Sequence, residues 1–215
     1  MEYEIRFYYS KDEYEEKISC LNKIKNLKRG ERKYEKTSQF NHPNKDYDFY
    51  SREIDGRFRV RVTKGENESK CKVSWKRRLP ITTLTKVNKE EEVELTININ
   101  EYENLIFIIK NVIHMTEVES YERYRTIFYN DEVEIALDEY PFGLALEIEA
   151  KTNNDDVEKV IDKYIKQLNL NYKDSYRLSW DDKYAELCEK QNKPKYNHVL
   201  FGKDMPEIRK NENEY

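Results

Sequence analysis

The chain opens with Met1-Glu2-Tyr3-Glu4-Ile5-Arg6-Phe7, in which charged and apolar residues alternate. Successive side chains of a β-strand point to opposite faces, so this stretch predicts a strand with Glu2, Glu4 and Arg6 together on one face. That face carries only charge, of both signs, and the other face is apolar. A single strand of this kind normally buries its apolar face and leaves the charged face in water. The rest of the chain decides whether that interpretation holds here.

The same alternation returns in six later segments, and there the charges of each segment have one sign. The basic segments carry Arg57/Arg59/Arg61, Lys72/Lys76 and Arg123/Arg125, and the acidic ones carry Glu92/Glu94, Glu134/Asp138 and Glu147/Glu149. Like charges on neighbouring strand positions repel, so segregation by sign costs stability unless a ligand of opposite charge offsets it. Basic strands suit a polyanion, and clustered carboxylates suit a hard cation such as Mg²⁺ or Mn²⁺. The pattern therefore predicts a site for a metal-bound polyphosphate.

Three segments have helical spacing and need an apolar sheet face to pack against. The first follows a capping box formed by Ser10 and Glu13, the second has Leu105, Ile108, Ile109 and Val112 on its expected buried face, and the third covers residues 157–168. We expect these helices to cover the apolar strand residues, Val93 and Leu95 among them. An open sheet would then leave its charged face in solvent, whereas a closed sheet would enclose the charges in a lumen with the helices outside.

Composition sets further limits on the function. The chain has 215 residues and a net charge of −4, which argues against sequence-independent binding of nucleic acid. Its three cysteines, Cys20, Cys71 and Cys188, lack metal-ligand spacing and predict reduced thiols in a cytoplasmic protein. The apolar run Leu105–Ile109 is too short to span a bilayer, so no membrane partner is expected.

Six short motifs, in order along the chain, resemble those of the CYTH superfamily, the triphosphate tunnel metalloenzymes, and in particular bacterial CYTH-domain phosphohydrolases. Glu2-Tyr3-Glu4-Ile5-Arg6 resembles the ExExK opening of that family. The remaining motifs are Phe58-Arg59-Val60-Arg61, Val73-Ser74-Trp75-Lys76, Glu92-Val93-Glu94, Arg123-Tyr124-Arg125 and the segment Val133–Glu149. The resemblance covers residues 1–190, and two positions depart from the family pattern: Arg6 stands where Lys is usual, and Glu90 where a basic residue is frequent.

The resemblance implies an α+β, mainly β fold, in which a closed eight-stranded antiparallel β-barrel has a charged lumen and helices packed outside. It assigns residues 1–190 to this tunnel domain and leaves residues 191–215 as a C-terminal extension, which we expect to be partly disordered. It also implies roles for individual residues. Glu2, Glu4, Glu147 and Glu149 would hold Mg²⁺ or Mn²⁺, and Glu2, Glu4 and Asp138 would be catalytic. Arg6, Arg59, Arg61, Lys76, Arg123 and Arg125 would bind the triphosphate, with Glu92 and Glu94 beside it.

The function implied is a metal-dependent phosphohydrolase that releases the terminal phosphate of tripolyphosphate, ATP or thiamine triphosphate by attack of a metal-activated water. Three alternatives stay open: a class IV-like adenylyl cyclase, an RNA 5′-triphosphatase, and a non-catalytic module that binds polyphosphate or nucleotide. Intact carboxylates argue against the last, since an anion binder has no use for them. No signature identifies the substrate, and both a monomer and a homodimer are compatible with the sequence.

Overall fold

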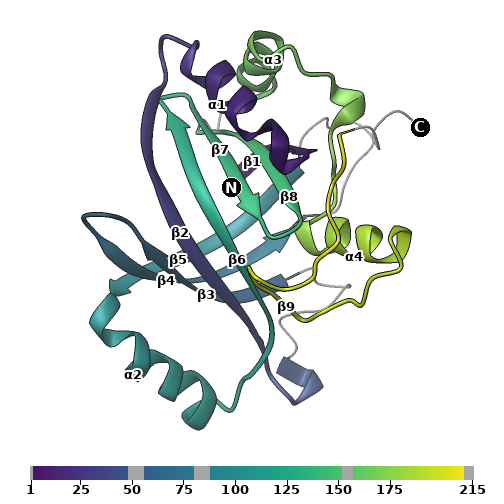
Figure 1. Cartoon of the computed structure of the whole chain (residues 1–215). Helices are drawn as coiled ribbons and strands as arrows, with labels where there is room; N and C mark the ends of the chain where they lie inside the picture. The colour runs from purple at the N-terminus through teal and green to yellow at the C-terminus, as the bar shows by residue number, and fades with distance from the viewer. Residues whose placement is uncertain (1, 48–55, 80–87, 152–156, 211–215) are drawn as a thin grey trace.

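Long charged strands dominate the chain, and in the computed structural model they close on themselves (Figure 1). The structure describes residues 2–47, 56–79, 88–151 and 157–210, with the side chain of Glu2 left out. The strands are β1 (Glu2–Tyr9), β2 (Lys28–Asn41), β3 (Gly56–Lys64), β4 (Ser69–Arg78), β5 (Asn88–Asn98), β6 (Thr116–Tyr129), β7 (Val133–Tyr140), β8 (Gly143–Ala150) and β9 (His198–Val199). The helices are α1 (Tyr14–Asn22), α2 (Tyr102–Phe107), α3 (Val157–Gln167) and α4 (Trp180–Lys190).

Eight of the strands form a closed antiparallel barrel. Their order is β2-β3-β4-β5-β1-β8-β7-β6, and β6 pairs with β2 to close the circle. The short β9 adds to β6 in parallel, outside the circle. The predicted closed eight-stranded barrel is thus confirmed. β1 lies between β5 and β8, and its register places Glu4 opposite Glu149 and Arg6 opposite Glu147.

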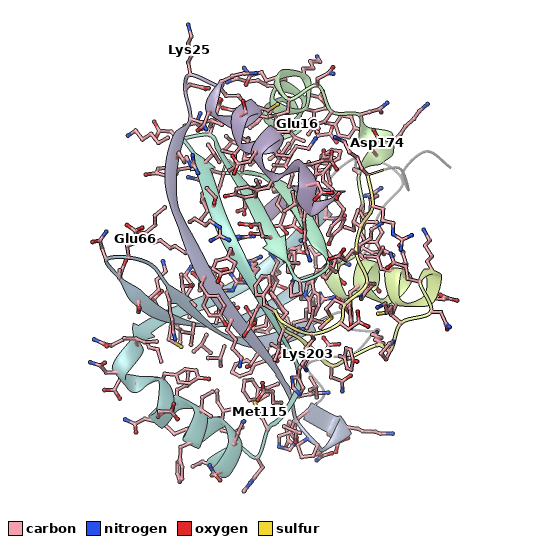
Figure 2. All side chains as sticks on the ribbon, viewed as in Figure 1. Glu16, Lys25, Glu66, Met115, Asp174 and Lys203 are labelled. Atoms are coloured by element: carbon pink, nitrogen blue, oxygen red, sulfur yellow. The ribbon has the colours of Figure 1, made fainter. Side chains whose placement is uncertain are left out.

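The alternation along the strands divides apolar from charged side chains across the wall of the barrel. Outward residues of β1 and β8, such as Phe7 and Ile148, pack against Leu21 of α1 and Ile161 of α3 in one buried core. The capping box before α1 forms as expected, since the Glu13 carboxylate accepts from the Ser10 N–H at 3.0 Å. The apolar side faces the helices, so the charged side faces the lumen. Figure 2 shows side chains filling the space between sheet and helices, with Lys25 and Glu66 projecting at the periphery.

The chain after α3 packs against one end of the barrel. Trp180 and Tyr184 of α4 share a core with Tyr121 of β6, and Val199, Met205 and Ile208 of the tail join it. Residues 191–210 contribute to this core, and residues 211–215 lie outside the described residues. The expected domain boundary at residue 190 stays a prediction. No helix in the described ranges is long and apolar enough to cross a membrane.

The helix after β5 differs from its expected packing. Val93 and Leu95 are 63% and 65% exposed, and Ile108 and Val112 are 46% and 62% exposed, so the prediction that these four are buried is wrong. Ile109 alone is fully buried there, against Val60 and neighbouring side chains of the barrel wall. The cause is local: α2 has six residues and continues as a π-helical turn over Ile108–Val112, whose i→i+5 hydrogen bonds break the 3.6-residue period on which the expected face depends.

This arrangement separates two neighbouring apolar positions experimentally. We expect Ile109→Ala to lower the free energy of unfolding by about 2–5 kcal/mol, because it leaves a cavity in a closed core. Val112→Ala, in the same turn but exposed, should change it by less than about 0.5 kcal/mol. Urea denaturation of both variants measures the difference. Equal losses would show that the turn packs differently from the arrangement described here.

Candidate active site

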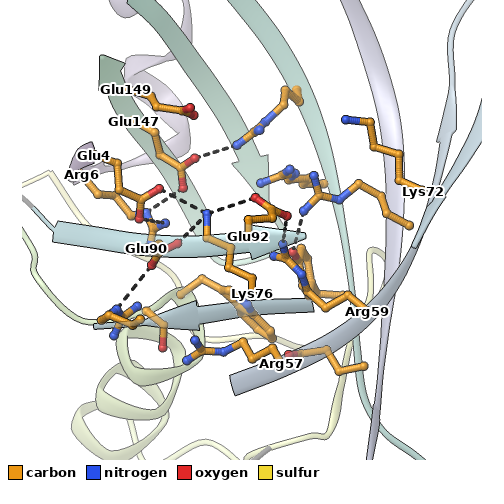
Figure 3. Close-up of a pocket in the computed structure, with 18 of the residues that line it drawn as sticks. Glu4, Arg6, Arg57, Arg59, Lys72, Lys76, Glu90, Glu92, Glu147 and Glu149 are labelled. Carbon is orange, nitrogen blue, oxygen red and sulfur yellow. Dashed lines mark hydrogen bonds and ion pairs between the residues drawn. The ribbon is translucent and has the colours of Figure 1, made fainter. Parts of the chain in front are cut away.

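The lumen of the barrel holds a cavity of about 360 Å³ whose wall is almost entirely charged (Figure 3). Nine basic and seven acidic side chains line it. The basic ones are Arg6, Arg57, Arg59, Arg61, Lys72, Lys76, Arg78, Arg123 and Arg125; the acidic ones are Glu4, Glu90, Glu92, Glu94, Glu134, Glu147 and Glu149. Each occupies an inward position of its strand, so the two-residue period of the sequence builds the wall directly.

The two signs of charge occupy different parts of the wall. β3, β4 and β6 contribute seven of the basic side chains and an eighth, Arg78, at the end of β4. β5, β7 and β8 contribute the carboxylates, apart from Glu4 on β1. An extended polyanion can therefore contact many cations from one side while the carboxylates face it from the other. Because many of these charged side chains are largely buried, their field is screened less than that of charges on an exposed surface.

One chain of ion pairs runs along β1, β8, β7 and β6. The Glu147 carboxylate accepts from Arg6 Nε at 2.7 Å and from Arg125 Nη2 at 2.7 Å. Asp138 accepts from Arg125 Nε at 2.6 Å and from Arg123 Nη1 at 2.8 Å. These bonds fix the planes of the arginine side chains before any ligand is present, which lowers the entropy lost on binding.

A second group of pairs centres on Lys76 of β4 (Figure 3). Its ammonium lies 2.5 Å from Glu90 and 3.8 Å from both Glu4 and Glu92. Arg59 also contacts Glu92, at 2.9 Å. The two groups join where Glu4 accepts from Arg6 at 3.1 Å. Most of the lumen is therefore one connected network, in which a bound anion must compete with the resident carboxylates.

The network fixes the charge states of its members. Burial alone would raise the pKa of Glu147, but Arg6 and Arg125 outweigh burial and hold that pKa well below its usual range. Glu35 of β2 behaves in the same way: burial raises its pKa, and the Arg123 and Arg61 guanidiniums lower it further than burial raises it. Both carboxylates are thus ionised across the neutral pH range.

Of the two tyrosines described in the lumen wall, Tyr121 of β6 is the one whose pKa falls. Burial raises it, yet the nearby guanidiniums of Arg61, Arg123 and Arg59 bring it down to about 7. Its hydroxyl accepts from Arg61 at 3.4 Å. The neighbouring Tyr140 shifts the other way, because burial dominates and the Asp138 charge adds to it. Tyr121 is thus a group that can donate or accept a proton near neutrality at the basic side of the lumen.

Solved structures with this arrangement are known. A protein from Pyrococcus horikoshii is 23% identical over 86% of this chain and 99% of its own, with a TM-score of 0.63. A candidate adenylyl cyclase from Hippeastrum, described as having a dominant triphosphatase activity, is 17% identical over 91% of this chain and 98% of its own, with a TM-score of 0.57. A further candidate adenylate cyclase, from Vibrio parahaemolyticus, is 15% identical over 84% and 96%, also with a TM-score of 0.57.

The chain shares the fold of these proteins, as the resemblance of its six motifs implied. At these identities the likeness establishes the fold alone. No family model matches the sequence, and no curated protein matches it.

Within this barrel, most of the residues expected at the site come together. Glu4, Glu147, Glu149, Glu92 and Glu94 line the lumen, as do all six basic residues expected to bind the triphosphate: Arg6, Arg59, Arg61, Lys76, Arg123 and Arg125. Asp138 does not line it. Its carboxylate is fully buried behind Arg123 and Arg125, so it positions these arginines and does not itself face a ligand. Glu2 is described by its backbone alone, which pairs with Glu90.

The carboxylates suit a hard divalent metal in type but are engaged by cations in the arrangement described. Among the described side chains, no three of the His, Cys, Asp and Glu residues are grouped closely enough to hold a metal ion. Glu4 and Glu147 both contact Arg6. Glu149 faces Glu4 across the β1–β8 ladder, so the oxygen donors that Mg²⁺ or Mn²⁺ prefers lie on adjacent strands. Binding a metal would require Arg6 to give up at least one of these contacts.

Several lumen residues were outside the expected site. Arg57 and Lys72 belong to strands recognised as basic, and Gln39 lies in a stretch that shows only a polar strand. Ser179 and Trp180 line the lumen from the start of α4. No local sequence signal ties α4 to the lumen, because that contact depends on where the chain returns after the barrel is complete.

The depressed carboxylate pKa values predict acid sensitivity. A carboxylate whose folded-state pKa lies below its ordinary value of 4.5 stabilises the fold above that pH, and the stabilisation is lost as the pH falls through the folded-state pKa. We therefore expect the free energy of unfolding to fall from about pH 5 to about pH 3. In Glu35→Gln the slope should be smaller, since one titrating group is gone. If urea denaturation shows the same pH dependence of the free energy of unfolding in Glu35→Gln as in the wild type, the depressed pKa of Glu35 would be contradicted.

Proposed function

We propose that the chain is a phosphohydrolase that removes the terminal phosphate of a small triphosphate with the help of Mg²⁺ or Mn²⁺. The observation that carries this proposal is the enclosed lumen, in which basic and acidic side chains face each other from different strands. A triphosphate bears several negative charges in a row, which match a row of basic side chains. A metal bound to the same triphosphate would face the carboxylates. A cytoplasmic location fits these substrates.

The chain's own residues would act mainly by positioning and charge stabilisation. Arg59 and Arg61 of β3 and Lys76 of β4 would contact the non-bridging phosphate oxygens, where negative charge is spread in the transition state of phosphoryl transfer. Arg123 and Arg125, held by Asp138, would do so from β6. Tyr121, with its pKa near neutrality, can exchange a proton with the terminal phosphate.

Glu4, Glu147 and Glu149 would hold the metal, together with Glu2, to which the resemblance gives the same role. A divalent ion bound there would neutralise phosphate charge and lower the pKa of a coordinated water, which supplies the nucleophile. The metal would displace Arg6 from at least one of these carboxylates. The phosphate oxygens of the substrate would then accept hydrogen bonds from Arg6, which offsets the lost contact.

An adenylyl cyclase is the second candidate, since several structural neighbours carry that description and one of them is also described as having a dominant triphosphatase activity. The same lumen would then hold ATP and release pyrophosphate. An RNA 5′-triphosphatase remains a further alternative, against which the net charge of −4 weighs.

One product assay tests the proposal. The purified protein is incubated with Mg²⁺ or Mn²⁺ and, separately, with tripolyphosphate, ATP, thiamine triphosphate and triphosphate-ended RNA. We expect orthophosphate from at least one of the small triphosphates, and none after chelation of the metal. Cyclic AMP with pyrophosphate would identify a cyclase. Tight binding without any product would identify a binding module.

A further inference from the structure

The two edges of β5 are paired to different extents. One edge pairs with β4 along the strand, from Glu90 opposite Arg78 to Asn98 opposite Lys70. The other edge pairs with β1 only near the start of β5, where the last pair is Glu90 with Glu2. Among the described residues no other strand borders β5, so residues 93–97 have no strand beside them on that side. We call residues 93–97 the free edge of β5.

Side chains on both faces of the free edge are exposed. Val93 and Leu95 point outward, and Glu94 and Thr96 point to the lumen side, yet all four are exposed. A neighbouring strand shields the side chains of a strand on both faces, because opposite residues lie about 4.5–5.5 Å apart. The exposure of the free edge thus follows from the missing neighbour. Backbone N–H and C=O groups along such an edge can pair with a further strand.

The outward residues of the free edge continue an apolar surface that begins on β4. Val73 lies opposite Leu95, and Trp75 lies opposite Val93. Ile97, the next outward residue, packs into the core beneath α2, whereas Val93 and Leu95 stay exposed. An apolar surface that adjoins an unpaired strand edge is typical of a site at which a second chain adds a strand.

The carboxylates of this part of β5 do not select a basic partner, because basic residues of β3 and β4 already contact them. The contacts are Glu91 with Arg77 at 2.7 Å, Glu92 with Arg59 at 2.9 Å and Glu94 with Lys72 at 2.5 Å. The free edge also contains no proline or lysine, two residues that hinder pairing at strand edges. Its charge is therefore offset locally, and an uncharged, apolar strand can approach it.

The free edge is complementary to itself in one antiparallel register. Pairing residues 93–97 with the same residues of a second copy places Leu95 opposite Leu95, Val93 opposite Ile97, and Glu94 opposite Thr96. Apolar residues then meet apolar residues on the outer face, and no carboxylate lies opposite another. A register centred on Val93 would instead place Glu92 opposite Glu94, and these like charges would repel.

We infer that two copies of the chain associate through their free edges, with β5 antiparallel to β5 about a two-fold axis at Leu95. Such an interface uses the same surface on both copies. The pairing joins β4 and β5 of both copies in one continuous sheet and keeps inward residues on one face. Thr96 of the second copy would lie beside Glu94, which lines the lumen. Each copy thus extends the lumen wall of the other, and this holds whether or not the proposed hydrolase function is correct.

Sedimentation equilibrium over a concentration series tests the association. We expect the wild-type protein to reach twice the mass of one chain. Leu95→Lys should raise the dissociation constant by about 100-fold or more, because it places two like charges on the axis. Val112→Lys, at a similarly exposed apolar residue of the π-helical turn, is the matched control and should leave the constant unchanged. A wild-type protein that stays monomeric, or equal effects of the two variants at unchanged melting temperature, would overturn the interface.

A mixing experiment tests the two-fold register itself. Leu95→Lys and Leu95→Glu each place like charges opposite one another when two identical copies pair. An equimolar mixture of the two variants instead allows opposite charges to meet on the axis. We expect the mixed pair to have a dissociation constant at least about tenfold lower than that of either variant alone. A mixture that associates no better than its components would overturn the register centred on Leu95.

Discussion

Glu4→Gln is expected to lower metal-dependent hydrolysis of the triphosphate substrate by about 100- to 1000-fold, the loss seen when one group that stabilises transition-state charge is removed. Glu4 is 4% exposed, lines the lumen and lies opposite Glu149, so its carboxylate is one of the two best placed for a shared metal. Glutamine keeps the size of the side chain but removes the charge that attracts the cation. Glu149→Gln should have an effect of the same order.

Stability measurements distinguish a metal ligand from a structural ion pair. Arg6 keeps its 2.7 Å contact with Glu147 in Glu4→Gln, so we expect the free energy of unfolding to fall by no more than about 1–3 kcal/mol. Mg²⁺ or Mn²⁺ should raise the melting temperature of the wild-type protein but not that of Glu4→Gln. Glu91→Gln, at a half-exposed pair with Arg77 on the outer face of β5, is the matched control and should behave as wild type. A normal metal-induced shift in Glu4→Gln would exclude Glu4 as a ligand.

Arg123→Met is expected to lower the free energy of unfolding by about 3–5 kcal/mol, the usual cost of removing one partner from a buried ion pair. The Arg123 side chain is 3% exposed and contacts Glu35 at 2.7 Å and Asp138 at 2.8 Å. Without it, Glu35 stays buried with a more distant cation, Arg61, at 3.8 Å. Turnover should fall as well, because the variant loses one of the charges expected to face the phosphate.

Lys72→Met provides the control for Arg123→Met. Lys72 pairs with Glu94 at 2.5 Å, but the two side chains are 28% and 37% exposed, so the loss should be at most about 1 kcal/mol. Arg123→Lys keeps the charge but cannot reproduce the forked geometry, and we expect an intermediate loss. Equal losses for Arg123→Met and Lys72→Met, in the same denaturant series, would show that Arg123 has no special role in the wall.

The closed barrel was implied by the resemblance of six motifs, because alternation alone left an open sheet possible. Alternation does decide, locally, which face of the sheet a side chain joins. Alternation placed Arg59 and Glu92 on the charged face of their strands, the resemblance placed them at the site, and both line the lumen. Alternation does not fix the depth of a residue along the barrel axis, which depends on the stagger between strands. Asp138 has the parity of a lumen residue, as do Glu134 and Tyr140 on either side of it, but its carboxylate is covered by the two arginines of β6 that it binds.

Contacts made after the barrel is complete could not be predicted either. Trp180 reaches the lumen only because the chain returns from α3 to the end of the barrel at which Tyr121 and Tyr140 meet. The π-helical turn after α2 similarly leaves no trace in the apolar pattern, since one extra residue in a turn shifts every later position. Both features concern how segments meet in space, which periodicity does not encode.

The position of β1 between β5 and β8 has a consequence for biosynthesis. Arg6 and Glu147, which meet in the lumen, are 141 residues apart in the chain. At a translation rate of about 5–20 residues per second, the ribosome needs roughly 7–28 s to make the partner of a strand it has already released. Until β8 is made, the edge of β1 that will pair with it is unpaired. An unpaired strand edge can pair with other chains and cause aggregation. The charges of Glu4 and Arg6 oppose such pairing, so the side chains of the lumen also protect the nascent chain until the barrel closes.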